Sequence, residues 1–174
     1  MKDKYMMSSQ LVTTYLGLGS NLEDRRRNLE MAIDFLSERL KIEQCSPIYD
    51  TSPVGDANQP RFLNMVIKVV TRLPAATLLF MAKGIEAKLG RVPIGSPRPI
   101  DIDLLFYGEQ IINSPPNLVV PHPKLHERAF VLVPLADLAP DLVHPVVKKK
   151  IKDLKELAEG KEDVKLYGSY ATKT

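Results

Sequence analysis

The sequence predicts an α+β fold of the ferredoxin-like type, an α/β sandwich in which helices cover an antiparallel sheet. The main observation is the order of the elements. Segments with the two-residue period of strands and the 3.6-residue period of helices follow one another as strand, helix, strand, strand, helix, strand, which is the split βαβ arrangement. The second observation is the length, because 174 residues fit one domain that can bury its own core.

The first strand and helix are predicted from residues 11–18 and from an apolar stripe between Leu29 and Leu40. Gly19-Ser20-Asn21 separates the two elements, and Ser20-x-x-Glu23 resembles a capping box at the start of the helix. A turn of this kind can present backbone N–H groups to an anion, or it can simply reverse the chain. The motif alone does not decide between these readings.

Two further strands are predicted, over 42–50 and 62–72, on either side of a loop of turn-forming residues at 51–60. Asn64 stands in the second of these strands among apolar neighbours. It is either a buried amide, whose donor and acceptor edges match those of a heterocycle, or an asparagine on an exposed face.

The second helix is predicted from Pro74 to Gly90, followed by a proline-containing loop at 91–97. That loop leads into a strand that starts at Asp101, and a hairpin turn at 107–110 is expected to follow it. A short helix is predicted from Ile151 to about Glu159.

The predicted domain covers 12–160, between an N-terminal tail at 1–11 and a C-terminal tail at 161–174. The hydrophobic content of 44% and charged content of 26% are typical of a globular protein. A net charge of only +3 gives little support to a nucleic-acid groove. We expect a monomer that binds neither nucleic acid nor membrane.

The single cysteine, Cys45, cannot form an internal disulfide and has no partner cysteines for a zinc cluster. The first residues lack the apolar core of a signal peptide, and no apolar stretch approaches the length of a transmembrane helix. These features predict a cytoplasmic protein.

The most informative motif is Arg-Pro-Ile-Asp-Ile-Asp, at 98–103. On a strand, Asp101 and Asp103 project from one face roughly 7 Å apart, and Ile102, Leu104 and Phe106 are expected on the other face. Paired carboxylates need a cation, and Mg²⁺ takes one or two carboxylates together with substrate phosphates. An exposed polar face of an edge strand is the alternative, but the nearby arginines Arg91 and Arg98 favour a polyphosphate site.

Taken in order, six motifs closely resemble those of the 6-hydroxymethyl-7,8-dihydropterin pyrophosphokinase family. The motifs are YLGLGSN at 15–21, SPIYDTSPVG at 46–55, FLN at 62–64, IExxLGR at 85–91, RPIDIDLL at 98–105, and PHP at 121–123 with RAF at 128–130. The resemblance extends from about Tyr15 to Pro145 and covers most of the predicted domain.

The resemblance implies an enzyme that transfers diphosphate from ATP to the hydroxymethyl group of 6-hydroxymethyl-7,8-dihydropterin, giving AMP and an activated pterin for folate synthesis. It implies that Asp101 and Asp103 hold two Mg²⁺ ions on the ATP phosphates. The other functional residues that it implies are Arg91 and Arg98 in catalysis and phosphate binding, Glu86, His122 and Arg128 at ATP, and Thr51, Pro53, Val54, Phe62, Asn64 and Phe130 at the pterin.

The sequence departs from some relatives in the loop between Arg91 and Arg98, which has only six residues and lacks a further arginine and a tryptophan. We therefore expect weaker or redistributed ATP contacts. Two rival classes are a nucleotide-sensing module and a metal-dependent phosphohydrolase. The first has no need of a two-metal clamp, and the second has no need of the 51–55 loop together with Asn64.

Overall fold

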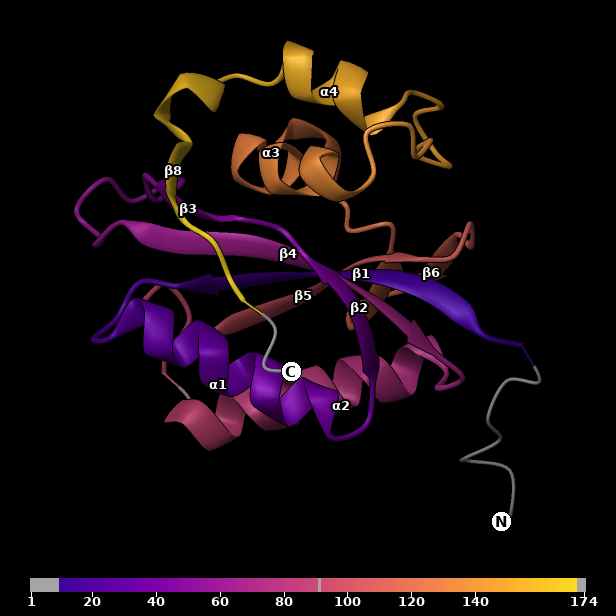
Figure 1. The fold of residues 1–174 in the computed structure, drawn as a ribbon, viewed down its shortest axis with the longest axis horizontal. Helices are drawn as coiled ribbons and strands as arrows, with labels where there is room; N and C mark the ends of the chain where they lie inside the picture. Colours follow the sequence, from indigo (N-terminus) through magenta and orange to yellow (C-terminus); the bar gives the residue numbers. More distant parts are fainter. Residues whose placement is uncertain (1–9, 91, 172–174) are drawn as a thin grey trace.

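The computed structural model describes residues 10–90 and 92–171, and its central element is a six-stranded antiparallel sheet (Figure 1). The strands lie in the order β5-β1-β4-β3-β8, and β2 also pairs with β4. This is the ferredoxin-like order with one added edge strand, so the predicted fold class is confirmed. The strands are β1 (Val12–Ser20), β2 (Lys41–Cys45), β3 (Ile48–Thr51), β4 (Phe62–Thr71), β5 (Asp101–Tyr107) and β8 (Lys165–Gly168).

Helices cover both faces of this sheet, with α1 and α2 on one side and α3 and α4 on the other (Figure 1). Each pair of helices encloses its own apolar cluster against the sheet, one around Leu29 and Ile67 and the other around Phe106 and Leu132. The helices are α1 (Arg25–Ser37), α2 (Ala75–Gly90), α3 (Ala129–Leu138) and α4 (Ile151–Leu157), with short 3₁₀ turns η1 (Leu125–Glu127) and η2 (Lys161–Asp163). No helix in the described ranges is both long and apolar enough to span a membrane.

The predicted strand at 42–50 is divided into β2 and β3 by Ser46 and Pro47. The Ser46 side chain is buried, and its hydroxyl accepts a hydrogen bond from the Val66 N–H at 2.9 Å. Pro47 has no N–H to continue the strand ladder. Both halves still pair with β4, so the break bends the strand without removing it from the sheet.

The predicted capping box at Ser20 is wrong. Helix α1 begins at Arg25, and its N-cap is Asp24, whose side chain accepts a hydrogen bond from the Arg27 N–H at 3.0 Å. Ser20 is instead the last residue of β1 and is fully buried. The helix therefore starts later than the capping motif predicts.

The predicted hairpin after β5 is also corrected. The chain does turn at Gly108, but β6 (Ile112–Ser114) pairs with β7 (Leu118–Val120) in a separate two-stranded sheet. A β-bulge affects β5 itself, because Tyr15 pairs with Phe106 while Leu16 pairs with Leu104. Phe106 consequently packs in the cluster under α3 and α4, and not on the face of Ile102 and Leu104 as expected.

The segment after residue 160, expected to be a tail, contains η2 and β8. Strand β8 pairs with β3 and runs along it as the yellow strand of Figure 1. The main sheet therefore includes residues from the last part of the chain.

Candidate active site

A cavity of about 300 Å³ lies on the side of the sheet that α3 covers. Its walls come from β1, the loop after β3, β4, β5 and the start of α3. The residues of the cavity that the sequence singled out are Thr51, Val54, Phe62, Asn64, Arg98, Asp101, Asp103, Arg128 and Phe130. The fold thus gathers most of the predicted site residues around one cavity.

Strand β1 forms the floor of the cavity with Gly17 and Gly19. Gly19 pairs with Asn64 of β4 on one side and with Asp101 of β5 on the other. A Cβ atom on Gly19 would meet Asn64 Oδ1 at 2.5 Å, which is too close for any real contact. The glycine therefore leaves room for the Asn64 amide to lie over β1, toward the carboxylate side of the cavity.

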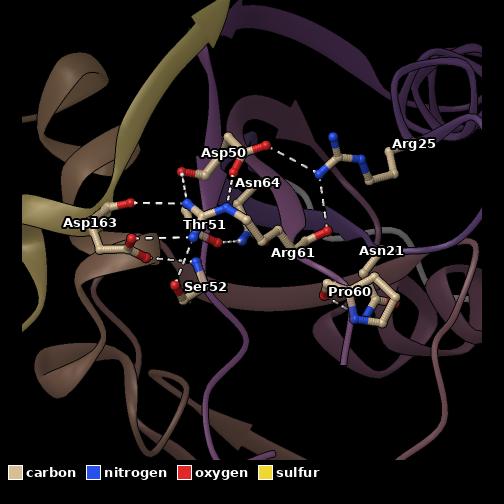
Figure 2. A network of polar contacts seen from close by, with 9 residues as sticks. All are labelled: Asn21, Arg25, Asp50, Thr51, Ser52, Pro60, Arg61, Asn64 and Asp163. Carbon is tan, nitrogen blue, oxygen red and sulfur yellow. Dashed lines mark hydrogen bonds and ion pairs between the residues drawn. The ribbon is translucent and has the colours of Figure 1, made fainter. Parts of the chain in front are cut away.

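Asn64 is a buried amide, with 8% of its surface exposed, so the exposed-face alternative is wrong. Its Nδ2 donates a hydrogen bond to the Thr51 hydroxyl at 2.8 Å (Figure 2). Thr51 is the last residue of β3 and is itself only 2% exposed. Because the two residues hold each other on adjacent strands, the polar edge at this end of the cavity has a fixed orientation.

Asp101 and Asp103 lie at the other end of the cavity, on β5. β5 is an edge strand, as the alternative reading supposed, but both carboxylates line the cavity. Asp101 forms an ion pair with the Arg98 guanidinium. Burial, followed by the charge of Asp101, raises the pKa of Asp103, while Lys83, Arg128 and Arg98 oppose that shift.

Burial is the main cause of the raised pKa of Asp103 and the neighbouring carboxylate adds to it, so a bound cation would stabilise the ionised pair. In the described part of the chain, no cluster of three or more His, Cys, Asp or Glu residues could hold a metal ion by itself. Two oxygen ligands with room for a substrate suit Mg²⁺, which binds few carboxylates and completes its coordination with water and phosphate oxygens. The donor set therefore fits this metal.

Basic and aromatic side chains surround the rest of the cavity. The guanidinium carbon of Arg98 lies 5.1 Å from the centre of the Phe62 ring, and that of Arg128 lies 5.5 Å from the centre of the Phe130 ring. Lys124, which the sequence analysis did not single out, also lines the cavity. This combination suits an aromatic ring next to an anion.

Three predicted residues do not line this cavity: Pro53, Glu86 and His122. Glu86 Oε1 accepts a hydrogen bond from the Ile102 N–H at 2.9 Å, between the two aspartates. The His122 N–H donates to the Leu105 carbonyl at 3.1 Å. Glu86 and His122 thus form hydrogen bonds with two backbone groups of β5, the Ile102 N–H and the Leu105 carbonyl. Arg91 lies outside the described residues.

His122 also lines a second cavity, of about 310 Å³, together with His126 and His144. Burial, with the nearby charges of Arg128 and Lys124, lowers the pKa of His122 to about 4. Its imidazole is therefore neutral at pH 7. Because Nδ1 accepts from the Lys124 N–H at 3.3 Å, we assign the ring proton to Nε2.

Sequence reasoning missed the role of Asn21, which is only 2% exposed. Its Oδ1 accepts from the Arg98 N–H at 2.7 Å, and its Nδ2 donates to the Gln59 side chain at 3.0 Å and to the Pro60 carbonyl at 3.3 Å. Gln59 in turn donates to the Gly95 carbonyl. Asn21 therefore joins the loop after β3 to the loop before β5, and the Gly-Ser-Asn turn was the signal that pointed to it.

Residues 15–140 match the family model of 7,8-dihydro-6-hydroxymethylpterin-pyrophosphokinase (HPPK). This chain belongs to that family. The HPPK match begins within β1 and ends just after α3, so it includes every element that lines the cavity.

Named relatives agree with this assignment to HPPK. The chain is 41% identical over 147 residues to the 2-amino-4-hydroxy-6-hydroxymethyldihydropteridine pyrophosphokinase of Aquifex aeolicus, covering 83% of this chain and 91% of that one. The enzyme of the same name from Pseudomonas aeruginosa is 45% identical over 136 residues, covering 75% and 83% of the two chains.

Longer proteins also contain a region similar to this HPPK chain. A folic acid synthesis protein of Pneumocystis carinii is 46% identical over 135 residues, which are 76% of this chain but 18% of that protein. The crystal structure of wild-type Plasmodium falciparum HPPK-DHPS with pteroate has a TM-score of 0.71 at 17% identity, covering 90% of this chain and 48% of that one. The chain therefore spans less than half of these two proteins, and the solved structure supports the fold alone.

Proposed function

We propose that this protein transfers diphosphate from ATP to the hydroxymethyl group of 6-hydroxymethyl-7,8-dihydropterin, giving AMP and the pterin diphosphate used in folate synthesis. One observation carries the proposal: a single cavity has the Asn64–Thr51 amide edge at one end and the Asp101–Asp103 pair at the other. The named pyrophosphokinases that are 41% and 45% identical to the chain support it.

The pterin end of the cavity supplies hydrogen-bonding groups and ring faces. Asn64 has an amide oxygen and a second N–H left after it donates to Thr51, and these two groups suit the edge of a pterin ring. Phe62 and Phe130 would pack against its faces, and the backbone of the loop at 51–55 would read the opposite edge. We include Pro53 and Val54 of that loop in the pterin site.

The phosphate end is where the reaction would take place. Asp101 and Asp103 would hold Mg²⁺, two ions by the family resemblance; when bound, the metal would neutralise the triphosphate and lower the pKa of the attacking hydroxyl. The pterin oxygen would bond to the β-phosphorus of ATP, the bond from that phosphorus to the α-phosphate oxygen would break, and AMP would leave. The hydroxyl proton would pass to solvent.

The arginines would stabilise the charge that is shared by the departing AMP and the transferred group. In this structure Arg98 neutralises Asp101, and its guanidinium would become available for phosphate once a cation takes over that role. Arg128 is suited to contact ATP because it lines the same cavity. We propose further nucleotide contacts for Arg91, Glu86 and His122 on the family resemblance.

All residues of the proposed site belong to one chain, so a monomer would suffice for activity. We propose that the enzyme acts in the cytoplasm, where its single cysteine would stay reduced. Burial raises the pKa of Cys45 to about 11, so this thiol would remain protonated and unreactive.

The deciding experiment is an incubation of the purified protein with ATP, Mg²⁺ and 6-hydroxymethyl-7,8-dihydropterin. AMP that forms only when the pterin is present would support the transferase. Phosphate released without the pterin would support a hydrolase instead. If the nucleotide binds but is not converted, the chain would be a sensor and the proposal would be wrong.

A further inference from the structure

Residues near the C-terminus contact the loop that we assign to the pterin. Asp163, the last residue of η2, lies beside Ser52 at the start of this loop (Figure 2). The family match ends at residue 140, so Asp163 lies outside the part of the chain that the family model covers. Strand β8 follows directly and pairs with β3, with Asp50 opposite Lys165, which fixes the position of Asp163.

Both oxygens of the Asp163 carboxylate accept hydrogen bonds, one from the loop and one from Arg61. Oδ2 accepts a hydrogen bond from the Ser52 N–H at 2.8 Å, and Oδ1 accepts from Arg61 Nη1 at 3.2 Å. The hydrogen bond from Ser52, with further help from Arg61, lowers the pKa of Asp163. The carboxylate is therefore ionised at neutral pH, and its hydrogen bond to the backbone is charge-assisted.

Arg61 extends the network to the other side of Thr51. Its Nη1 donates to the Ser52 hydroxyl at 2.8 Å, its Nη2 donates to the Asp50 carbonyl at 3.3 Å, and its Nε pairs with the Asp50 carboxylate. Both chain neighbours of Thr51 are thus bound to the same guanidinium (Figure 2). Thr51 between them accepts the hydrogen bond that orients the buried Asn64 amide.

We propose that Asp163 is a positioning residue for the pterin subsite, acting through the Ser52 N–H and Arg61 on the Thr51–Asn64 pair. This inference rests on the proposed function. The carboxylate does not line the cavity, so it would hold the pterin-reading groups in place without touching the substrate. Its loss should leave the Asp101–Asp103 end unchanged.

The position of this network predicts a selective kinetic effect. Removing the carboxylate leaves the Ser52 N–H without its partner and leaves the start of the loop at 51–55 held by Arg61 alone, which weakens pterin binding. ATP binding and the chemical step depend on β5 and the arginines beside it. A purely structural role would instead lower the folded fraction and reduce all activity together.

The test compares Asp163→Ala, Asp163→Asn and Glu162→Ala by steady-state kinetics for each substrate, with thermal unfolding of each protein measured in parallel. Asp163→Asn keeps an oxygen that can accept from Ser52, and Glu162 is an exposed acid one residue away. Asp163→Ala should raise KM for the pterin about tenfold, with kcat and KM for ATP within about twofold of wild type. Asp163→Asn should recover most of that loss, and Glu162→Ala should resemble wild type.

Two results would overturn this role. One is an unchanged pterin KM in Asp163→Ala. The other is a fall in kcat that follows the loss of folded protein, with the pterin KM unchanged in the fraction that remains folded. An inactive wild-type protein would refute the proposed function itself, whereas an active wild type with unchanged Asp163→Ala kinetics would refute only the role of Asp163.

Discussion

Asn64 and Asp101 face each other across a single residue, since both pair with Gly19 from opposite sides of β1. The amide that we assign to the pterin and a carboxylate that we assign to the metal are therefore fixed by one register of three adjacent strands. Strands in a packed sheet do not slip, because a one-residue shift would turn every side chain to the other face. The distance between the two ends of the site is thus set by the sheet and not by its loops.

Replacing Gly19 with alanine tests this arrangement. The new Cβ would lie 2.5 Å from Asn64 Oδ1, so the amide would have to leave the position in which it donates to Thr51. We expect a loss of about 1–3 kcal/mol in the free energy of unfolding, together with an increase of at least tenfold in KM for the pterin. Steady-state kinetics and urea unfolding measure the two effects.

Gly84→Ala is the matched control, because a Cβ at this exposed position of α2 meets no atom within 4 Å. It should stabilise the protein by about 0.5–1 kcal/mol and leave the kinetics unchanged. If Gly19→Ala showed wild-type pterin KM, Asn64 would not read the substrate in the position seen here.

Arg98→Ala should affect turnover more than pterin binding. The guanidinium pairs with Asp101 and is placed to stabilise charge in the transition state. We expect kcat to fall about 10²–10³-fold, with KM for the pterin changed by only a few-fold. Arg27→Ala, at a helix position where the side chain is 58% exposed, is the control and should keep full activity. Wild-type turnover in Arg98→Ala would contradict the assignment.

Glu86 offers a test between a structural and a nucleotide-binding role. Glu86→Ala would leave the buried Ile102 N–H without its acceptor and should reduce the free energy of unfolding by about 1–3 kcal/mol. Glu86→Gln keeps an oxygen acceptor and should be close to wild type in stability. If the stability of Glu86→Ala were unchanged while KM for ATP rose, the residue would act on the nucleotide and not on β5.

The protonation of His122 gives a prediction for pH. Its pKa is lowered to about 4 in the folded protein, from an ordinary value of 6.5, so the unfolded chain binds the extra proton between these pH values. Unfolding is then favoured as the pH falls through this window, and the stability contribution of neutral His122 is complete only above about pH 6.5. Burial and the nearby His126 also lower the pKa of His144, which adds to the same trend.

NMR titration of the histidine side chains measures this directly. The His122 ring should titrate with a midpoint near pH 4, and ATP binding should be insensitive to pH between about 6 and 8 as far as this residue is concerned. A midpoint near 6.5 would show that the ring is more exposed to solvent than it is here.

The order of the predicted elements was sufficient for the fold class, and the family resemblance named most of the residues that the structure gathers around one cavity. Asp101 and Asp103 lie on one side of β5 as their spacing required. Phe106 does not lie on the predicted face of β5, because the bulge opposite Tyr15 and Leu16 moves its side chain to the other face of the strand. A bulge depends on the partner strand and leaves no local pattern.

Long-range polar contacts could not be predicted from the sequence either. Asn21 is bound to Arg98 and Pro60, and Asp163 is bound to Ser52, across separations that no short motif encodes. Ser20 with Glu23 resembled a capping box, yet Asp24 competes for the same role and becomes the N-cap. Local propensity could not decide whether Ser20 or Asp24 is the N-cap.

The most direct test of the central claim is to follow the products of one reaction by ³¹P NMR and mass spectrometry, using purified wild-type protein with ATP, Mg²⁺ and 6-hydroxymethyl-7,8-dihydropterin. The account predicts one AMP for each pterin that gains a diphosphate, and loss of both products when Mg²⁺ is chelated or when Asp101 and Asp103 are changed to asparagine. AMP or phosphate formed without any pterin diphosphate would contradict it.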